Sequence, residues 1–379
     1  MRVIINEIKK LFSVKSLIIL GLIVFIIWNL SVDNLIKYFP NGSATGFNLS
    51  IEMLKDYGTT MDEKEFEDFK EKSVSLEKEA DEYLKQDEDA KELGIESYRE
   101  FVDSTGKENY GNEKIRELDL KIDRGDKGYL FEELGTRENL ISNYENKGYR
   151  HNDISQNRQE SLEELEKSDQ PQSVLSFDTF NNYNDLIRYF STIIVVTIAF
   201  IISPIFSKDE KKKVNLLQYS SKMGRKIAKK KVISAMITSF SIATLELIAI
   251  FALYSQNNTL QFWNCSINSS FNNFTYWFDL TFGQYIMLSV FLIYVLTFVV
   301  TSISLFVSSK VKNYVALIGI QVPILWGLIA FLEEIGLNNI TVLWRPKYLL
   351  HITYGALIVI SIVLIVILLK KEKNRDVLN

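Results

Sequence analysis

Side chains that commonly carry out catalysis are few and widely spaced in this sequence. Its 379 residues include two histidines, His151 and His351, and one cysteine, Cys265. Neither H-E-x-x-H nor G-x-x-x-x-G-K-[ST] occurs, so the usual patterns of zinc proteases and phosphate-binding loops are missing. A single cysteine cannot form an intrachain disulfide. The sequence therefore predicts no catalytic residues and no metal site, and we do not expect the chain to be an enzyme.

One carboxylate does lie within an apolar segment, residues 232–254, where an ionised group is a candidate for function. Two interpretations of Glu246 are open. It lines a path for a substrate, or it pairs with a polar neighbour near the outer end of the segment. The second is favoured because Glu246 is only about two helical turns from Tyr254. Arg188, at the edge of another apolar segment, is expected to extend its charged end to water.

Six apolar blocks set the fold class. Each block is close to the ~20 residues that an α-helix needs to cross a bilayer. The blocks are residues 17–32, 186–206, 232–254, 284–308, 314–332 and 352–369. The sequence therefore predicts an all-α integral membrane protein, with transmembrane helix 1 over residues 15–32 and transmembrane helices 2–6 within residues 186–379.

Lysine and arginine are concentrated in alternate connections. Ten of the 24 residues from Lys208 to Lys231 are basic, whereas residues 255–283 contain no lysine or arginine. Cytoplasmic loops of membrane proteins are enriched in these residues. Both termini are therefore expected in the cytoplasm, and residues 33–185 and 255–283 outside the cell. We expect Cys265, in the second outer segment, to react with an impermeant thiol reagent unless that loop is buried.

Two segments of the N-terminal region, the first apolar block and residues 1–14, can each be interpreted in two ways. The first apolar block could be a signal peptide, but polar residues follow it in place of a small-residue cleavage site, which favours an uncleaved span. Residues 1–14 place apolar side chains on one helical face between Ile4 and Phe12. This pattern predicts an interfacial helix on the inner leaflet, with basic residues near lipid headgroups. A helical extension of the first span is the alternative.

The insert between the first two spans, residues 33–185, is strongly acidic. It carries 38 acidic and 20 basic residues, whereas the rest of the chain carries 9 and 23. Apolar residues recur at helical spacing over 66–84, with Gly94 as the expected stop, and over 115–122, 137–144 and 159–167. These patterns predict a mainly helical extracellular domain. Its acidity is either a solvated surface or a field that attracts cationic ligands.

The basic connection after the second span resembles the cytoplasmic loop of permease subunits of type-2 ABC exporters, which export drugs, antibiotics and polypeptides. In that family the span ends in Phe-Ser and an acidic residue, and a Leu-rich helix, a Ser-Ser-basic-x-Gly-Arg-like turn and a lysine follow. The matching positions here are Phe206, Ser207, Glu210, Leu216, Leu217, Ser220, Ser221, Lys222, Gly224 and Arg225. Val214-Asn215 replaces the family's Gly-Thr pair, and Lys231 opens the third span about one place early. Residues 305–324 are similar to the family's fourth-to-fifth turn.

This resemblance implies a transmembrane permease subunit of the bacterial cell membrane that exports amphipathic peptide, antibiotic or lipid-like substrates. The loop at 207–231 would couple it to a separate ABC ATPase, and ATP-Mg would bind that partner rather than this chain. Six spans are half of the usual exporter, so a second copy or a paralogous permease is expected, together with membrane lipids. No nucleic-acid partner is expected. Leu216 and Leu217 could enter a groove of the ATPase, and Gly224 permits a tight turn back to the membrane.

Other function classes stay open. The basic loop could be only an anchor that fixes topology. The chain could also be a membrane-anchored sensor or immunity protein whose acidic extracellular domain binds a cationic peptide without transport. A membrane enzyme has no set of residues in its favour.

Overall fold

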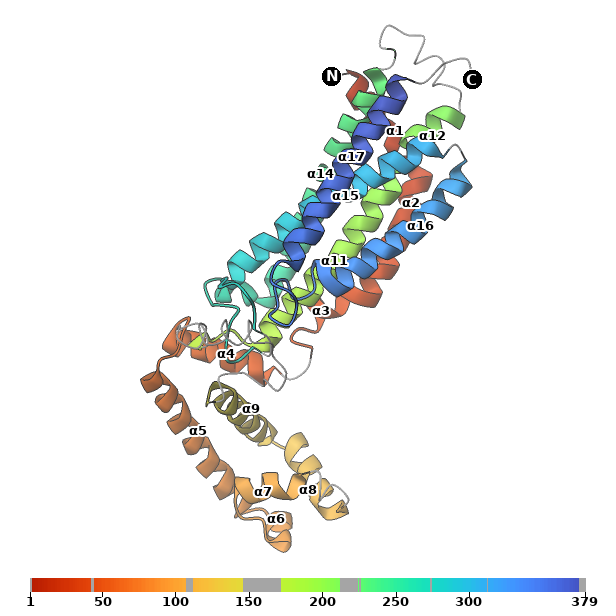
Figure 1. The fold of residues 1–379 in the computed structure, drawn as a ribbon. Helices are drawn as coiled ribbons and strands as arrows, with labels where there is room; N and C mark the ends of the chain where they lie inside the picture. Colours follow the sequence, from red (N-terminus) through yellow and green to blue (C-terminus); the bar gives the residue numbers. More distant parts are fainter. Residues whose placement is uncertain are drawn as a thin grey trace. The chain divides into compact units, whose positions relative to one another are not determined.

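The computed structural model describes residues 2–41, 44–106, 112–145, 172–211, 224, 226–272, 275–311 and 313–374. Over these ranges the regular elements are all helices, and strand pairing is limited to two isolated β-bridges. The chain divides into two compact units (Figure 1). The bundle unit contains residues 1–41, 181–260 and 283–379, and the insert unit contains residues 42–180 and 261–282.

Six helices of the described residues are long and apolar enough to cross a membrane, as the sequence predicts. Their bounds are Val14–Lys37, Phe177–Asp209, Lys226–Asn257, Phe282–Lys310, Val315–Gly336 and Leu349–Lys373. In Figure 1 they carry the labels α2 (Val14–Ile27), α11 (Phe177–Ile202), α14 (Lys226–Tyr254), α15 (Phe282–Lys310), α16 (Tyr314–Phe331) and α17 (Leu349–Lys373). The fold is that of a multi-pass membrane protein.

Helix α11 is the most enclosed of the six. Of its most apolar window, 83% is buried, compared with 11% for α2. Some polar side chains of this span are paired with other helices of the bundle. Tyr183 Oη lies 2.6 Å from Ser289 Oγ of α15, and Ser203 hydrogen-bonds Gln321 of α16. Hydrogen bonds between helices hold membrane bundles together because hydrocarbon offers polar groups no alternative partner.

The N-terminal residues form a helix of their own, α1 (Arg2–Leu11). Ser13, in an extended conformation, caps the start of α2 by accepting a hydrogen bond from the Ser16 amide. Because the chain breaks between the two helices, α1 is not a helical extension of the first span. α1 packs against α14 and against α12 (Pro204–Lys211).

The helices expected in the insert over 66–84, 115–122 and 137–144 are present, whereas 159–167 lies outside the described residues. The insert contains α4 (Thr45–Tyr57), α5 (Glu63–Leu84), α6 (Glu88–Leu93), α7 (Tyr98–Thr105), α8 (Glu113–Arg124) and α9 (Gly128–Glu145). Gly94 ends α6 rather than α5, with φ of 71°. The reason is Asp87, whose carboxylate caps a new helix by accepting from the amides of Asp89 and Ala90.

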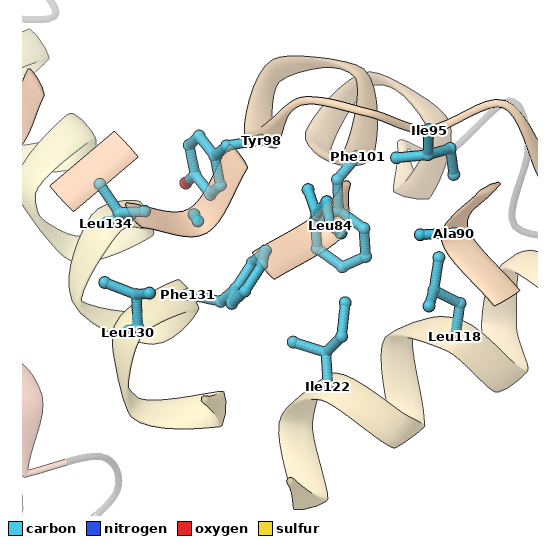
Figure 2. Close-up of a cluster of buried hydrophobic side chains, with 11 residues drawn as sticks. Leu84, Ala90, Ile95, Tyr98, Phe101, Leu118, Ile122, Leu130, Phe131 and Leu134 are labelled. Carbon is cyan, nitrogen blue, oxygen red and sulfur yellow. The ribbon is translucent and has the colours of Figure 1, made fainter. Parts of the chain in front are cut away.

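A separate hydrophobic core lies among the helices of the insert unit. Figure 2 shows its side chains converging from α5, α7, α8 and α9. The Phe131 ring packs against three aromatic rings, with centroid distances of 5.9 Å to Tyr83, 5.9 Å to Tyr98 and 5.2 Å to Phe101. The spacing of apolar residues in the sequence thus produces a buried cluster within this unit.

The segment 261–282 belongs to the insert unit although it follows the third span. The Ser173 hydroxyl donates to the Ser266 carbonyl at 2.9 Å, and Ser266 pairs with Thr281 in a β-bridge. Cys265 is fully buried in this segment, and burial raises the pKa of its thiol to about 12. Labelling of Cys265 was expected only if its loop were not buried, and that condition is not met, because the loop is folded into a compact unit.

Candidate coupling site at one end of the bundle

Four segments that the sequence assigns to the same side gather at one end of the bundle. They are α1, α12 with the start of α14, the end of α15, and the end of α17. The Phe206 amide donates to Ser308 Oγ at 3.1 Å, and Lys371 Nζ donates to the Ser309 carbonyl at 3.2 Å. These contacts bring α12, α15 and α17 to a common end, as the predicted alternation of loops requires.

Most of the residues that carry the family resemblance are not described. Residues 212–223 and Arg225 lie outside the described residues. These include Leu216, Leu217, Ser220 and Ser221. Glu210 lies in α12, and its side chain is likewise outside the description. Gly224 is described and has φ of 47°, in the left-handed region that favours glycine.

Pro204 determines where the helix that precedes the loop begins. Helix α11 ends at Ile202, and Pro204 is the first residue of α12. Proline is favoured at a first helical position because its φ is already helical and no hydrogen bond of its missing amide is lost. The register that follows places Ile205 and Asp209 four residues apart on one buried face.

A buried ion pair connects the two sides of the loop. Asp209 Oδ2 lies 2.7 Å from Lys231 Nζ, and the two side chains are 6% and 4% exposed. The Lys231 ammonium also donates to the Ile205 carbonyl at 3.0 Å and lies 4.7 Å from the centre of the Phe206 ring. Lys231 does not open the third span, because α14 already begins at Lys226. It lies in the second turn and points at α12.

Helix α1 adds two more charges. Lys10 Nζ lies 2.7 Å from Glu7 Oε1 and 3.5 Å from Asp209 Oδ1. Burial lowers the pKa of Lys10, but the hydrogen bond to Glu7 and the charges of Glu7 and Asp209 outweigh it, so the pKa is raised overall. We call Glu7, Lys10, Asp209 and Lys231 the charge cluster.

The sequence analysis named Glu210 for this site and did not name Asp209. The structure shows Asp209 buried and paired, whereas the side chain of Glu210 lies outside the described residues, so its expected role stays a prediction. The available signal was the interval of four residues between Ile205 and Asp209, which puts the carboxylate on the same face as an apolar residue.

Glu246 forms no ion pair in the part of the chain that is described. Its carboxyl lies beside the Thr197 side chain of α11. Glu246 Oε2 and Thr197 Oγ1 are both buried, and neither has a hydrogen-bond partner among the described residues. Both interpretations of Glu246, a residue on a substrate path and a residue paired with a polar neighbour, therefore stay predictions.

Arg188 does not extend to water as expected. Its guanidinium lies 2.7 Å from Asp185 and 3.1 Å from Glu333, and its side chain is 15% exposed. Glu333 lies in the short π-helix η5 (Leu332–Gly336), which follows α16. Two carboxylates within reach make an ion-pair network more favourable than an extended side chain.

The described residues contain no group of three or more His, Cys, Asp or Glu side chains that could hold a metal ion. No family model matches the chain, and no curated protein or solved structure matches it either. What the fold defines is a class, the multi-pass membrane proteins.

Proposed function

We propose that this chain is the transmembrane permease subunit of an ATP-driven ABC exporter of the type-2 class. The observation that supports the proposal is the common end of the bundle, to which α1, α12, α15 and α17 all contribute. The basic loop 207–231 leaves from this end, and its flanking helices are packed firmly together. A loop held in this way can transmit a displacement between a soluble partner and the spans.

In this proposal the common end faces the cytoplasm of a bacterial cell and the insert unit faces outward. Leu216 and Leu217 enter a groove on the ABC ATPase, as a short helix does when its apolar face is buried by a partner. Glu210 and Arg225 make polar contacts at the rim of that groove, and Ser220, Ser221 and Gly224 form the turn back to the membrane. ATP-Mg is bound and hydrolysed by the ATPase, and the permease performs no covalent chemistry.

The complete exporter contains a second copy of this chain or a paralogous permease, two ATPase subunits and surrounding lipids. Substrates are amphipathic peptides, antibiotics or lipid-like molecules. Glu246 is the candidate for a residue on their path, because an unpaired carboxylate oxygen inside a membrane bundle is rare unless it is functional.

We expect Leu217→Asp to abolish association with the ATPase while the permease still inserts into the membrane. The substitution removes an apolar contact and would strand a charge in the groove. Insertion should survive because the other basic residues of 208–231 still fix orientation. The measurement is the amount of ATPase that co-purifies with the chain. Lys212→Gln is the control and should co-purify as much ATPase as the wild type. Undiminished association of Leu217→Asp would reduce the loop to an anchor that fixes topology.

Orientation can be tested with an impermeant maleimide on intact cells. The wild-type chain should not react, because Cys265 is buried and its raised pKa leaves little of the reactive thiolate. In a Cys265→Ala background, Asn264→Cys should be labelled from outside, because Asn264 is exposed. Ser221→Cys should be labelled only after the cells are opened. Labelling of Ser221→Cys in intact cells would contradict the proposed topology.

A sensor or immunity protein is the second candidate, and the insert unit is the observation in its favour. This unit has its own hydrophobic core and could bind a cationic peptide without help from the spans. The two functions differ in one measurable respect: the sensor requires no ATPase to co-purify.

A further inference from the structure

Asp209 is the central acceptor of the charge cluster. Its carboxylate lies 2.7 Å from Lys231 Nζ of α14 and 3.5 Å from Lys10 Nζ of α1. One carboxylate of α12 is thus shared between a lysine from the N-terminal helix and a lysine from the helix after the basic loop. Glu7 is the fourth member of the cluster, and the formal charges of these four described residues sum to zero. The side chains of Glu7, Asp209 and Lys231 are at most 6% exposed.

An ion pair of this kind specifies geometry more than it adds stability. Both partners lose their hydration on burial, and their attraction only roughly compensates for that loss. Separating the partners is unfavourable because each charge is then buried alone. The buried Asp209–Lys231 pair therefore resists separation of α12 from α14. Lys10, whose side chain is 43% exposed, attaches α1 to the same carboxylate by a longer contact of 3.5 Å.

Contacts to the main chain of α1 impose a second restraint. Lys208 Nζ of α12 donates to the Lys10 carbonyl at 3.2 Å. Ser234 Oγ of α14 lies 3.2 Å from the Ile4 carbonyl and 2.9 Å from the Lys230 carbonyl of its own helix, so its one proton is shared between these two acceptors. Both α12 and α14 therefore contact the main chain of α1.

We propose that Lys10, Glu7 and Asp209 are positioning residues that make α1 a moving part of the coupling site. This inference rests on the function proposed above. When the ATPase displaces the loop, α12 shifts relative to α14, and the shared carboxylate of Asp209 transmits the shift to α1 through Lys10. The position of α1 therefore changes with the nucleotide that is bound to the ATPase.

The test measures hydrogen exchange in residues 2–11 of the complex between the full chain and its co-purified ATPase. Spectra are compared without nucleotide and with MgATP plus vanadate. In the wild type, the nucleotide should change exchange in α1. In Lys10→Gln the ATPase should still co-purify, and the nucleotide-dependent change of exchange in α1 should be lost. Lys10→Arg keeps the charge and should retain the response.

Lys9→Gln is the matched control, because it removes the same charge from a neighbouring exposed position of α1. It should respond to nucleotide as the wild type does. A wild-type response in Lys10→Gln would overturn the proposal, as would an α1 that ignores nucleotide while residues 204–211 respond.

Absence of any co-purifying ATPase would refute the proposed function instead. In that case the chain alone still tests the cluster. Lys10→Gln and Asp209→Asn should then have non-additive effects on exchange in α1, because the two side chains share one contact. Additive effects would show that Asp209 does not hold α1 through Lys10, and the inference would fail.

Discussion

Phe131→Ala is expected to destabilise the insert unit by about 3–5 kcal/mol, the usual cost of removing a buried aromatic ring. Phe131 packs against the rings of Tyr83, Tyr98 and Phe101, so its loss leaves a cavity bordered by rigid groups. The measurement is hydrogen exchange of the full chain in detergent, followed in peptides from α5 to α9. Protection there should fall at least about a hundredfold, since 1.4 kcal/mol corresponds to a factor of ten.

Tyr129→Ala is the control for this substitution. Tyr129 is two residues away on the same helix, and it is 57% exposed. Its removal should leave exchange in α5–α9 close to that of the wild type. Equal effects of the two substitutions would mean that the cluster drawn in Figure 2 is not the core of this unit.

Arg137→Met should have a similarly large effect, for an electrostatic reason. The Arg137 side chain is 3% exposed and lies 2.8 Å from Glu133 and 3.0 Å from Glu52, which joins α9 to α4. The guanidinium also lies over the ring of Phe69. Removing it leaves the carboxylate of Glu133, only 14% exposed, without its partner. Removing one partner of a buried ion pair typically costs about 3–5 kcal/mol. The measurement is the unfolding temperature of the insert unit, which should fall.

The comparison is with Arg99→Met, which breaks the ion pair of Arg99 with Glu77. The Arg99 side chain is 77% exposed, so water and salt already screen the attraction. We expect little change in unfolding temperature. Equally small changes in unfolding temperature for both substitutions would contradict the prediction, because the buried ion pairs of Arg137 would then stabilise the unit no more than an exposed pair.

The spans could be predicted because their signal is compositional. Twenty apolar residues have few alternatives to a membrane helix, whatever lies around them. The helices of the insert were predicted for a related reason, since apolar residues at helical spacing such as Leu118 and Ile122 produce one buried face. The end of α5 was misplaced because a side-chain cap, Asp87, outweighs the more conspicuous Gly94.

The partners of the candidate site could not be predicted. The burial of Asp209 depends on the register of α12, which begins at Pro204. Arg188 was expected to extend its guanidinium to water. Its partner Glu333 is distant in the sequence, so the sequence did not indicate that the two residues form an ion pair. Cys265 lies in a segment without helical or strand periodicity, and its burial depends on contacts with residues near Ser173.

The polar contacts of α11 have a consequence for biogenesis. In the span that contains α11, residues 177–209, Asn184, Tyr183 and Ser203 find partners 101, 106 and 118 residues later in the sequence. At about 5–20 residues per second, a ribosome needs about 5–25 s to supply them. During that interval the nascent α11 has polar groups that lipid cannot satisfy. We expect the insertion machinery to retain α11 until α15 and α16 emerge, whereas the largely exposed, apolar α2 can be released into the bilayer at once.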